Sequence, residues 1–252
     1  MHPPADFDTA AMAPDGRRAK LIAEGALQQT GKRRVRHVMG WVILLLAGTA
    51  LGFNIDDALL AWVQNRHGQA ARQRVQNWRD LLATSPSLAE MQKLEAVNTF
   101  FNRLTFTPDR QTWQREDYWA TPLETLALGA GDCEDFALAK YFTLTALGVE
   151  ESRLRLTYVK ALKLNQAHMV LTYYAEPDAA PWVLDNLDPR IKPATDRDDL
   201  VPVYSFNGTG LWLARQRGQG KPAGGSERLP LWRDMLERMR QESNRTDPER
   251  SP

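Results

Sequence analysis

The sequence contains only one cysteine, Cys133, and four histidines among its 252 residues. A single cysteine forms no disulfide within the chain, so a disulfide-stapled scaffold is excluded. So few cysteines and histidines also leave almost no ligands for a zinc site. The 32 Lys and Arg residues nearly balance the 31 Asp and Glu residues, giving a formal net charge of +1. No overall basic field therefore indicates binding to nucleic acid.

The composition is that of an ordinary globular protein, with 43% hydrophobic and 25% charged residues. These fractions exclude a collagen-like, fully disordered or multi-span membrane protein. The length suits one sizeable domain, with or without additional segments at its ends.

The N-terminal region predicts export from the cytoplasm. Residues 1–37 are rich in proline and alanine and end in a basic cluster, which predicts a disordered basic arm. An uncharged apolar run follows and predicts a signal or anchor helix over residues 38–55, with its basic side in the cytoplasm. Small residues at 48–50 suit cleavage by a signal peptidase, so a cleaved signal and a retained anchor both fit. A buried core helix fits less well, because the basic cluster adjoins the apolar run.

The spacing of apolar residues predicts helices first and strands afterwards. Spacings of three and four predict helices over residues 57–82, 88–104 and 133–147, and Ser87 and Glu90 are expected to form a capping box before the second. Alternation of apolar and polar residues then predicts strands at 153–159, 167–174 and 182–187, with further β structure within 201–213. This order predicts an α+β domain over residues 56–215, with helices packed on an antiparallel sheet.

The C-terminal segment, residues 216–252, is predicted to lie outside that domain. Its Gly-rich start at residues 218–226 predicts a flexible linker. A short amphipathic helix over residues 229–239 and a loose polar end follow.

Cys133 is the first candidate for chemistry. It follows a Gly-rich segment and opens the third predicted helix, where the helix dipole and free backbone amides stabilise a thiolate. We therefore expect a lowered pKa and a nucleophilic thiol. The alternative is a small buried residue with no chemical role. The acidic neighbours Asp132, Glu134 and Asp135 argue against this alternative.

His168 and Asp185 are the candidate base and its orienting carboxylate. They lie on the two strands of a predicted hairpin whose turn would place them opposite each other. A carboxylate in that position fixes the tautomer of the imidazole and stabilises its protonated form. Taken singly, His168 reads equally well as a core histidine, and Asp185 as a turn residue.

These residues resemble the bacterial transglutaminase-like cysteine proteinases, and within them the LapG-type periplasmic proteases. The resemblance extends from about residue 88 to residue 213, roughly half of the chain. It is carried by residues 131–137 (GDCEDFA), 166–171 (QAHMVL) and 183–187 (VLDNL), together with 117–119, 122–124 and 202–207.

The resemblance implies a papain-like, transglutaminase-like cysteine protease fold and a catalytic triad. Cys133 would be the nucleophile, His168 the general base and acid, and Asp185 the orienting residue. The resemblance also implies dependence on calcium, with Asp132 and Glu134 as ligands. Asp135 is a further candidate ligand, although at a helix start it could instead complement the dipole, and Asp132 could be a plain N-cap.

The resemblance further implies a location, a substrate and a regulator. The protease would act in the periplasm, tethered to the inner membrane if its N-terminal segment is retained. It would cleave a large repeat-type surface adhesin near its N-terminus, at paired alanines. This cleavage would release cells from a biofilm. An inner-membrane cyclic-di-GMP receptor of the LapD type would sequester the protease.

Two questions about the chemistry stay open from the sequence. The backbone N–H of Cys133 is the first expected oxyanion donor, and the indole of Trp119 is the second, unless Trp119 is simply a core aromatic. The same triad also fits transglutaminase or amidase acyl transfer, because either acyl donor forms the same thioester. A non-catalytic periplasmic adaptor is the third possibility, and the complete triad argues against it.

Overall fold

The computed structural model describes residues 53–215 and 218–245. The predicted basic arm at residues 1–37 lies outside these ranges, as does all but the last three residues of the predicted signal or anchor helix. Within the ranges described, no helix has the length and apolar character needed to cross a bilayer.

Two helices form the start of the described chain, where the apolar pattern predicted one. They are α2 (Asp57–His67) and α3 (Gln69–Thr84), and Gly68 separates them. Gly68 has a φ of 86°, a conformation that glycine adopts without strain, so the chain bends there. The buried Trp78 of α3 donates its indole N–H to the Thr143 hydroxyl at 2.9 Å, which ties this helix to the centre of the molecule.

Helix α4 (Glu90–Phe101) begins later than predicted. Its N-cap is Ala89 rather than Ser87. The side chain of Gln92 accepts the backbone N–H of Ala89 at 3.1 Å, so it takes the reciprocal role that the predicted capping box gave to Glu90.

Short elements connect α4 to the helix that carries the cysteine. The strands β1 (Thr105–Phe106) and β2 (Ala130–Gly131) pair in parallel, so the segment after α4 lies beside the segment that leads to the cysteine. The four elements are β1 (Thr105–Phe106), α5 (Asp109–Thr112), α6 (Pro122–Leu128) and β2 (Ala130–Gly131).

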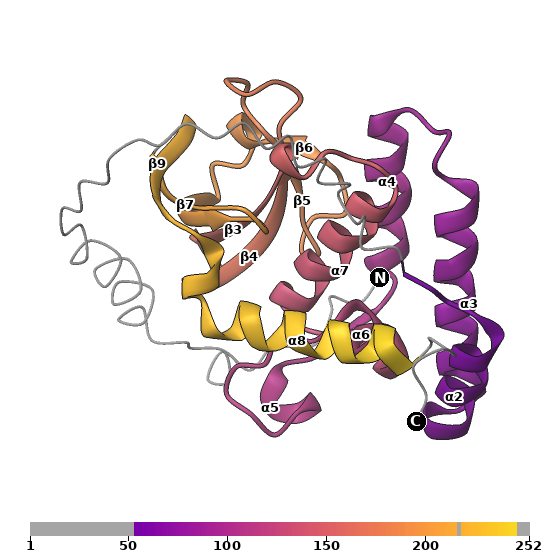
Figure 1. The fold of residues 1–252 in the computed structure, drawn as a ribbon. Coiled ribbons are helices and arrows are strands. Elements are labelled where there is room, and N and C mark those ends of the chain that lie inside the picture. The colour runs from indigo at the N-terminus through magenta and orange to yellow at the C-terminus, as the bar shows by residue number, and fades with distance from the viewer. Residues whose placement is uncertain (1–52, 216–217, 246–252) are drawn as a thin grey trace, which may run out of the picture.

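Helix α7 (Cys133–Ala146) lies at the centre of the molecule and is buried along almost its whole length. It packs against α4 and α6 on one side. On the other side it packs against the strands β3 (Leu154–Ala161) and β4 (Gln166–Tyr173) (Figure 1). As predicted, the helix closes at Gly148, which has a φ of 81°. The N-terminus of this helix, where Cys133 lies, is therefore packed between the helical layer and the sheet.

A seven-stranded antiparallel sheet forms the other layer, in the order β6-β5-β4-β3-β7-β8-β9. The α+β architecture predicted from the sequence is thus confirmed. Among the described residues, three short 3₁₀ helices lie in the connections, at Glu151–Arg153, Ala194–Asp196 and Ser226–Arg228. The strands are β3 (Leu154–Ala161), β4 (Gln166–Tyr173), β5 (Trp182–Leu184), β6 (Lys192–Pro193), β7 (Leu200–Phe206), β8 (Leu211–Arg215) and β9 (Gly218–Gly224).

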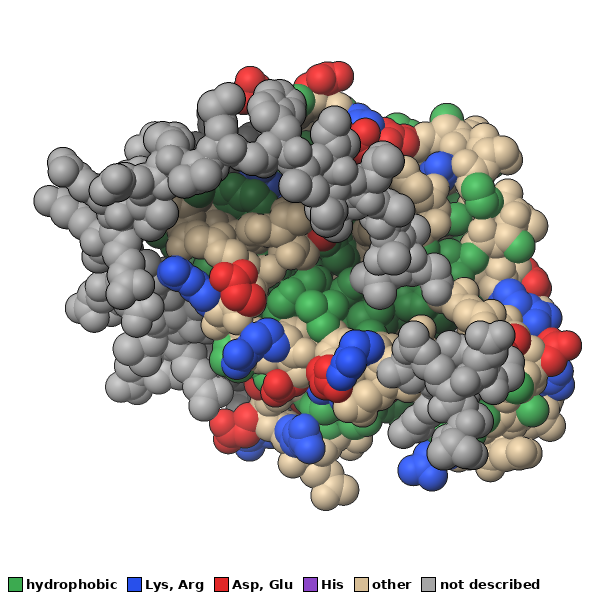
Figure 2. Space-filling view, in the orientation of Figure 1, with side chains coloured by type: hydrophobic (Ala, Val, Ile, Leu, Met, Phe, Trp, Pro, Cys, Tyr) green, Lys and Arg blue, Asp and Glu red, His purple; other side chains and the backbone are tan. Residues whose placement is uncertain are grey.

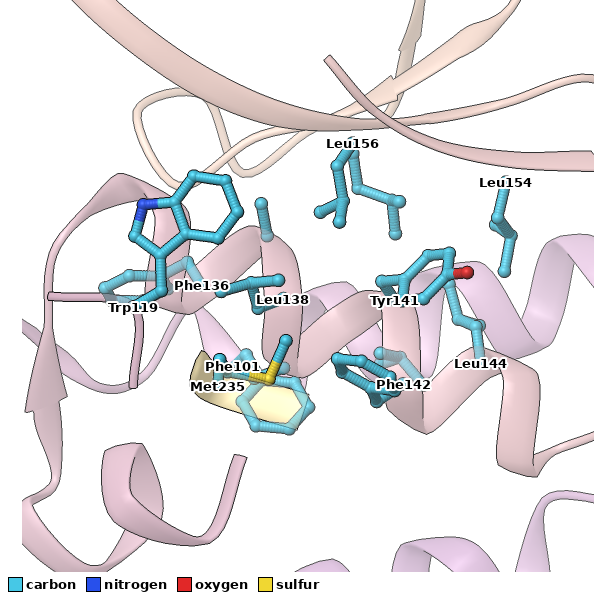
Figure 3. Packing of buried hydrophobic residues seen from close by; sticks show 14 of the residues in the cluster. Phe101, Trp119, Phe136, Leu138, Tyr141, Phe142, Leu144, Leu154, Leu156 and Met235 are labelled. Carbon is cyan, nitrogen blue, oxygen red and sulfur yellow. The ribbon is translucent and has the colours of Figure 1, made fainter. Parts of the chain in front are cut away.

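The main core lies between α7 and the sheet. Figure 3 shows side chains of α7 meeting Leu154 and Leu156 of β3 and Met235 of the last helix. Trp119 lies in the same cluster, and its ring stacks on Phe206 with centroids 5.5 Å apart. Burial of this apolar surface is the main source of stability and fixes the position of α7 against β4.

The prediction of a flexible linker at residues 218–226 is wrong. Residues 218–224 form β9, which pairs with β8 at the edge of the sheet. Helix α8 (Pro230–Arg245) follows and is longer than predicted. It buries Trp232, Met235 and Met239 against the core, and charged side chains lie where its outer face crosses the molecule (Figure 2). The C-terminal segment up to residue 245 is therefore part of the domain.

Candidate active site

Cys133 is held at the first position of α7, directly after its N-cap Asp132. Strand β2 fixes the approach to the helix, since Thr107 donates its backbone N–H to the carbonyl oxygen of Gly131 at 2.8 Å. A side chain at Gly131 would place its Cβ 2.7 Å from a carboxylate oxygen of Asp135, so glycine is needed there. The predicted position of the thiol at a Gly-rich helix start is confirmed.

The carboxylate of Asp135 ties two backbone segments together. Its Oδ1 accepts the backbone N–H of Ala120 at 2.7 Å, and its Oδ2 accepts that of Asp132 at 3.2 Å. The residue is fully buried. Asp135 was expected as a possible calcium ligand, but the structure engages both of its oxygens with backbone amides at the start of α7. It therefore acts as a capping and bridging residue.

The thiol of Cys133 lies in an acidic, buried environment. It donates to Oε2 of Glu134 at 2.9 Å. Burial raises its pKa well above the ordinary value, the charges of Glu134 and Asp132 raise it further, and a hydrogen bond from the backbone N–H of Met169 lowers it. The sequence predicted a lowered pKa from the helix dipole, and this direction is wrong, because the pKa of Cys133 is raised. Burial and two neighbouring carboxylates outweigh the dipole.

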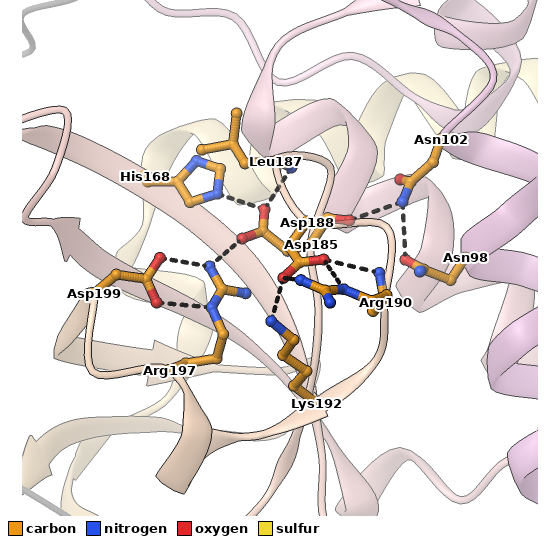
Figure 4. A network of polar contacts seen from close by, with 10 residues as sticks. All are labelled: Asn98, Asn102, His168, Asp185, Leu187, Asp188, Arg190, Lys192, Arg197 and Asp199. Carbon is orange, nitrogen blue, oxygen red and sulfur yellow. Dashed lines mark hydrogen bonds and ion pairs between the residues drawn. The ribbon is translucent and has the colours of Figure 1, made fainter.

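His168 and Asp185 form a buried hydrogen-bonded pair (Figure 4). Nε2 of His168, in β4, lies 2.7 Å from Oδ1 of Asp185, the residue that follows β5. Only 2% of His168 and 1% of Asp185 is exposed. The same Oδ1 also accepts the backbone N–H of Leu187 at 3.0 Å. The predicted pairing of these two side chains is thus present in the structure.

Further contacts that the sequence analysis missed hold Asp185 in place. Its Oδ2 accepts from Nη2 of Arg197 at 2.7 Å, and Arg197 also binds Asp199. The backbone carbonyl oxygen of Asp185 accepts from Nδ2 of Asn102 at 2.8 Å. Burial raises the pKa of Asp185, but the hydrogen bond and charge of His168, with Leu187 and Arg197, outweigh it and hold the pKa well below its usual range. Asp185 is therefore a carboxylate at neutral pH.

This arrangement fixes the tautomer of His168. A carboxylate only accepts hydrogen bonds, so Nε2 carries a proton and donates it to Asp185. In the neutral ring Nδ1 is then left as a proton acceptor. The thiol of Cys133 lies against the same strand, because Met169, the next residue after His168, donates its backbone N–H to the sulfur. The three predicted triad residues thus converge at the start of β4.

A group of three carboxylates lies beside the thiol. Ligand oxygens of Asp109, Asp132 and Glu134 all lie within 4.8 Å of one another. Asp109, at the start of α5, was missed by the sequence analysis, because it is distant in sequence and no local motif marks it. Burial, with the charges of Glu134 and Asp117, raises the pKa of Asp109 to about 7.

Two buried carboxylate oxygens in this group are available to bind a cation. Oδ1 of Asp109 and Oδ1 of Asp132 have no hydrogen-bond partner among the residues that the structure describes. Carboxylates crowded together in a buried place are costly unless a cation neutralises them. An oxygen-only donor set of this kind suits a hard divalent cation such as calcium.

Trp119 occupies a packing position. Its side chain is 6% exposed and stacks on Phe206 in the core. Its backbone carbonyl oxygen accepts from Arg238 of α8. These contacts match the core role that the sequence left open for Trp119, and its assignment as an oxyanion donor stays a prediction.

A family model describing the bacterial transglutaminase-like cysteine proteinases (BTLCP) matches residues 52–214. The chain belongs to this family. It is accordingly a cysteine peptidase with a transglutaminase-like fold, as the resemblance of its motifs predicted. Among curated proteins, none matches the chain.

Solved structures of Legionella pneumophila LapG support the same assignment. One is 42% identical in sequence, with a TM-score of 0.62, and the match covers 71% of this chain and 97% of that one. A structure of the EGTA-treated protein gives the same values. The calcium-bound structure, also 42% identical, has a TM-score of 0.63 and covers 72% of this chain and 98% of that one.

Proposed function

We propose that this protein is a calcium-dependent periplasmic cysteine endopeptidase that cleaves the N-terminal region of a large surface adhesin and so releases cells from a biofilm. In this proposal Cys133 is the nucleophile, His168 the general base and acid, and Asp185 the orienting carboxylate. The observation that carries it is the buried pair of Nε2 of His168 and Oδ1 of Asp185, 2.7 Å apart, on the strand that contacts the thiol.

The first half of the reaction forms a thioester. Nδ1 of His168 takes the proton of the Cys133 thiol while the sulfur attacks the carbonyl carbon of the peptide bond. The carbonyl oxygen becomes an oxyanion, and the backbone N–H of Cys133, free at the helix start, is the first donor to stabilise it. The C–N bond then breaks, and His168 returns the proton to the departing amine.

The second half releases the product. His168 takes a proton from a water molecule, whose oxygen attacks the thioester carbon. The C–S bond breaks, the new carboxyl group leaves, and the sulfur of Cys133 regains its proton from His168. Asp185 stabilises the imidazolium in both halves, and Arg197 keeps Asp185 ionised and in place.

The acidic group supports the calcium requirement. Asp109, Asp132 and Glu134 would hold the ion, and two of them have buried oxygens without partners among the described residues. When bound, calcium supplies positive charge beside the thiol. That charge opposes the carboxylates that raise the pKa of Cys133. The proposal that calcium is the ion also draws on the calcium-bound LapG structure.

A cleavage assay on an adhesin fragment tests the proposed activity. A recombinant N-terminal fragment with a paired-alanine segment is incubated with the protein in calcium, and products are identified by mass spectrometry. We expect a single cut at the paired alanines, and none with Cys133→Ala, whose thermal melting should stay close to that of the unaltered protein. Turnover by Cys133→Ala at the normal rate would rule out the nucleophile.

Two further arms separate the alternatives. A primary-amine probe is added to the same reaction, and the fragment is searched for amine incorporation. Amine incorporation without cleavage would assign transglutaminase-type acyl transfer to the triad in place of proteolysis. Binding of the fragment with neither reaction would assign an adaptor.

We also propose a periplasmic location and regulation by an inner-membrane cyclic-di-GMP receptor. Fractionation of cells with an antibody to the chain tests the location, and N-terminal sequencing of the recovered protein tells a cleaved signal from a retained anchor. Co-purification with the receptor, with and without cyclic-di-GMP, tests the regulation. Recovery in the cytoplasm, or no nucleotide-dependent binding, would contradict these two parts.

A further inference from the structure

A cavity of about 560 Å³ lies at the end of the sheet where β3 begins and β4 ends. Arg155, Tyr174 and Trp212 contribute to its wall, with Asn207 and Thr209 from the turn between β7 and β8. A volume of this size accommodates a single side chain or a small organic acid. The proposed proteolysis makes no use of this cavity.

Arg155 is the unusual residue of this wall. Only 5% of it is exposed, although it carries a charge. Its guanidinium lies between two aromatic rings, 4.7 Å from the ring centroid of Tyr174 and 4.1 Å from that of Trp212. The two rings interact favourably with the faces of the cation and hold its plane in one orientation.

The N–H donors in the plane of the guanidinium are only partly satisfied by hydrogen bonds. Arg155 interacts with Tyr174 by hydrogen bonding, but its Nε and Nη1 donors have no hydrogen-bond partner among the residues that the structure describes. Aromatic faces compensate the charge and leave in-plane N–H groups without an acceptor. A buried donor without an acceptor costs about 1–3 kcal/mol, and more when it is charged. Such a group indicates that an acceptor from outside completes the site.

The neighbouring charges favour a carboxylate as that acceptor. Arg153, the other arginine of the cavity wall, is already engaged with Glu90 at 2.6 Å. Glu150 and Glu176 also line the cavity, and their charges disfavour a doubly charged anion. A single carboxylate matches one unpaired guanidinium in charge, and it accepts in-plane N–H donors in a geometry that arginine prefers.

We propose that this cavity binds a carboxylate, anchored by Arg155 between Tyr174 and Trp212. The site is separate from the triad. Arg155 pairs with Thr172 in the sheet, whereas His168 pairs with Val159 four residues further along β3, about 13 Å away at the usual rise of a strand. The carboxylate comes either from a free small acid or from an acidic side chain of a bound polypeptide.

Binding measurements on the full chain test this proposal. Isothermal titration calorimetry at pH 7, with constant calcium and ionic strength, compares propionate, which carries a single carboxylate, with propionamide. It also compares a blocked pentapeptide, acetyl-Ala-Ala-Glu-Ala-Ala-amide, with its glutamine counterpart. We expect at least one of the two acids to bind and its neutral analogue to bind at least about tenfold more weakly, as loss of a charge-assisted hydrogen bond predicts.

Variants locate the binding. Arg155→Gln should weaken binding of the acid by about tenfold or more, whereas Arg240→Gln, on the exposed face of α8, should leave it unchanged. If Arg155→Gln does not fold, two other measurements test the site. One compares each acid with its amide in the unaltered protein, and the other looks for loss of acid binding in Trp212→Phe.

The outcomes divide as follows. Binding of propionate alone assigns a free small acid, and binding of the glutamate peptide alone assigns a polypeptide side chain; both support the site. Failure of both acids to bind, equal binding of acid and amide, tighter binding of inorganic phosphate than of either acid, or unchanged affinity in Arg155→Gln would each overturn it. Because adhesin cleavage is measured separately, failure here leaves the proposed function intact.

Discussion

Asp185 reaches His168 diagonally rather than from directly across the hairpin. The ladder between β4 and β5 pairs Leu171 with Leu184, so its continuation sets Asp185 opposite Val170, two residues from His168. A shift of two residues keeps both side chains on the same face of the sheet. The carboxylate therefore still lies 2.7 Å from Nε2. It can do so because Arg197 and the Leu187 amide hold it in position.

Asp185→Asn should abolish most activity with little change of fold. The amide can donate to Nε2, which favours the wrong tautomer of His168, so we expect kcat to fall by about 10³- to 10⁴-fold. The matched control is Asp188→Asn, three residues away, where the carboxylate pairs with Arg190 and Lys192 at the surface. Peptide-cleavage kinetics and circular dichroism measure both variants. A kcat within a few-fold of normal in Asp185→Asn would contradict the role assigned to this residue.

The same carboxylate should make stability depend on pH on the acid side. The pKa of Asp185 in the folded protein lies below its usual range, whereas in the unfolded chain it is about 3.9. Its stabilising contribution is therefore fully present above pH 4–5 and is lost as the pH falls through the folded pKa. Urea denaturation between about pH 6 and pH 2.5 should show a steeper loss in the unaltered protein than in Asp185→Asn. Parallel curves would contradict the assigned pKa shift.

The sequence predicted the architecture well where local pattern and local geometry agree. Helical spacing located the helix that starts at Cys133, and alternation located β3 and β4. The sequence predicted correctly that His168 and Asp185 share a face of the sheet. The predicted pairing of the two strands was shifted by two residues, and a shift of two leaves each side chain on the same face. An error of one residue would have separated them.

Other features depend on tertiary contacts that leave no local trace. Asp109 and Arg197 come from other segments of the chain. Only folding brings Asp109 to Asp132 and Glu134, and Arg197 to Asp185. The pKa of Cys133 was predicted in the wrong direction because the helix dipole was weighed without burial and without the charges of Glu134 and Asp132. The Gly-rich residues 218–224 read as a linker because pairing with β8, rather than their composition, makes them a strand.

Asp109→Asn should weaken calcium binding. The substitution removes one of three clustered carboxylates, so we expect at least about a tenfold rise in the calcium Kd, since each charged ligand contributes strongly to such sites. Chelation should inactivate the unaltered protein and lower its Tm, and excess calcium should restore both. Calorimetric titration with calcium measures the Kd. An unchanged Kd in Asp109→Asn, or activity that is insensitive to EGTA, would contradict the site.

Asp135→Asn should separate a structural carboxylate from a ligand. Both oxygens of Asp135 accept backbone N–H groups, and an amide replaces one acceptor with a donor. We expect a loss of about 1–3 kcal/mol in the free energy of unfolding at every calcium concentration, while the calcium Kd stays near normal. Asp109→Asn, which should raise the calcium Kd, is the control measured alongside it. A large rise in the calcium Kd of Asp135→Asn would show that Asp135 is a calcium ligand after all.

Trp232→Ala should show that α8 belongs to the folded domain. Trp232 is 2% exposed and stacks on Phe142 with centroids 5.6 Å apart, so its removal leaves a cavity in the core. We expect the free energy of unfolding to fall by about 3–5 kcal/mol. Arg240→Ala, on the exposed side of the same helix, should change it by less than about 0.5 kcal/mol. Urea denaturation measures both variants. Equal stability of Trp232→Ala and Arg240→Ala would mean that α8 is a loosely attached segment, as the Gly-rich sequence before it had suggested.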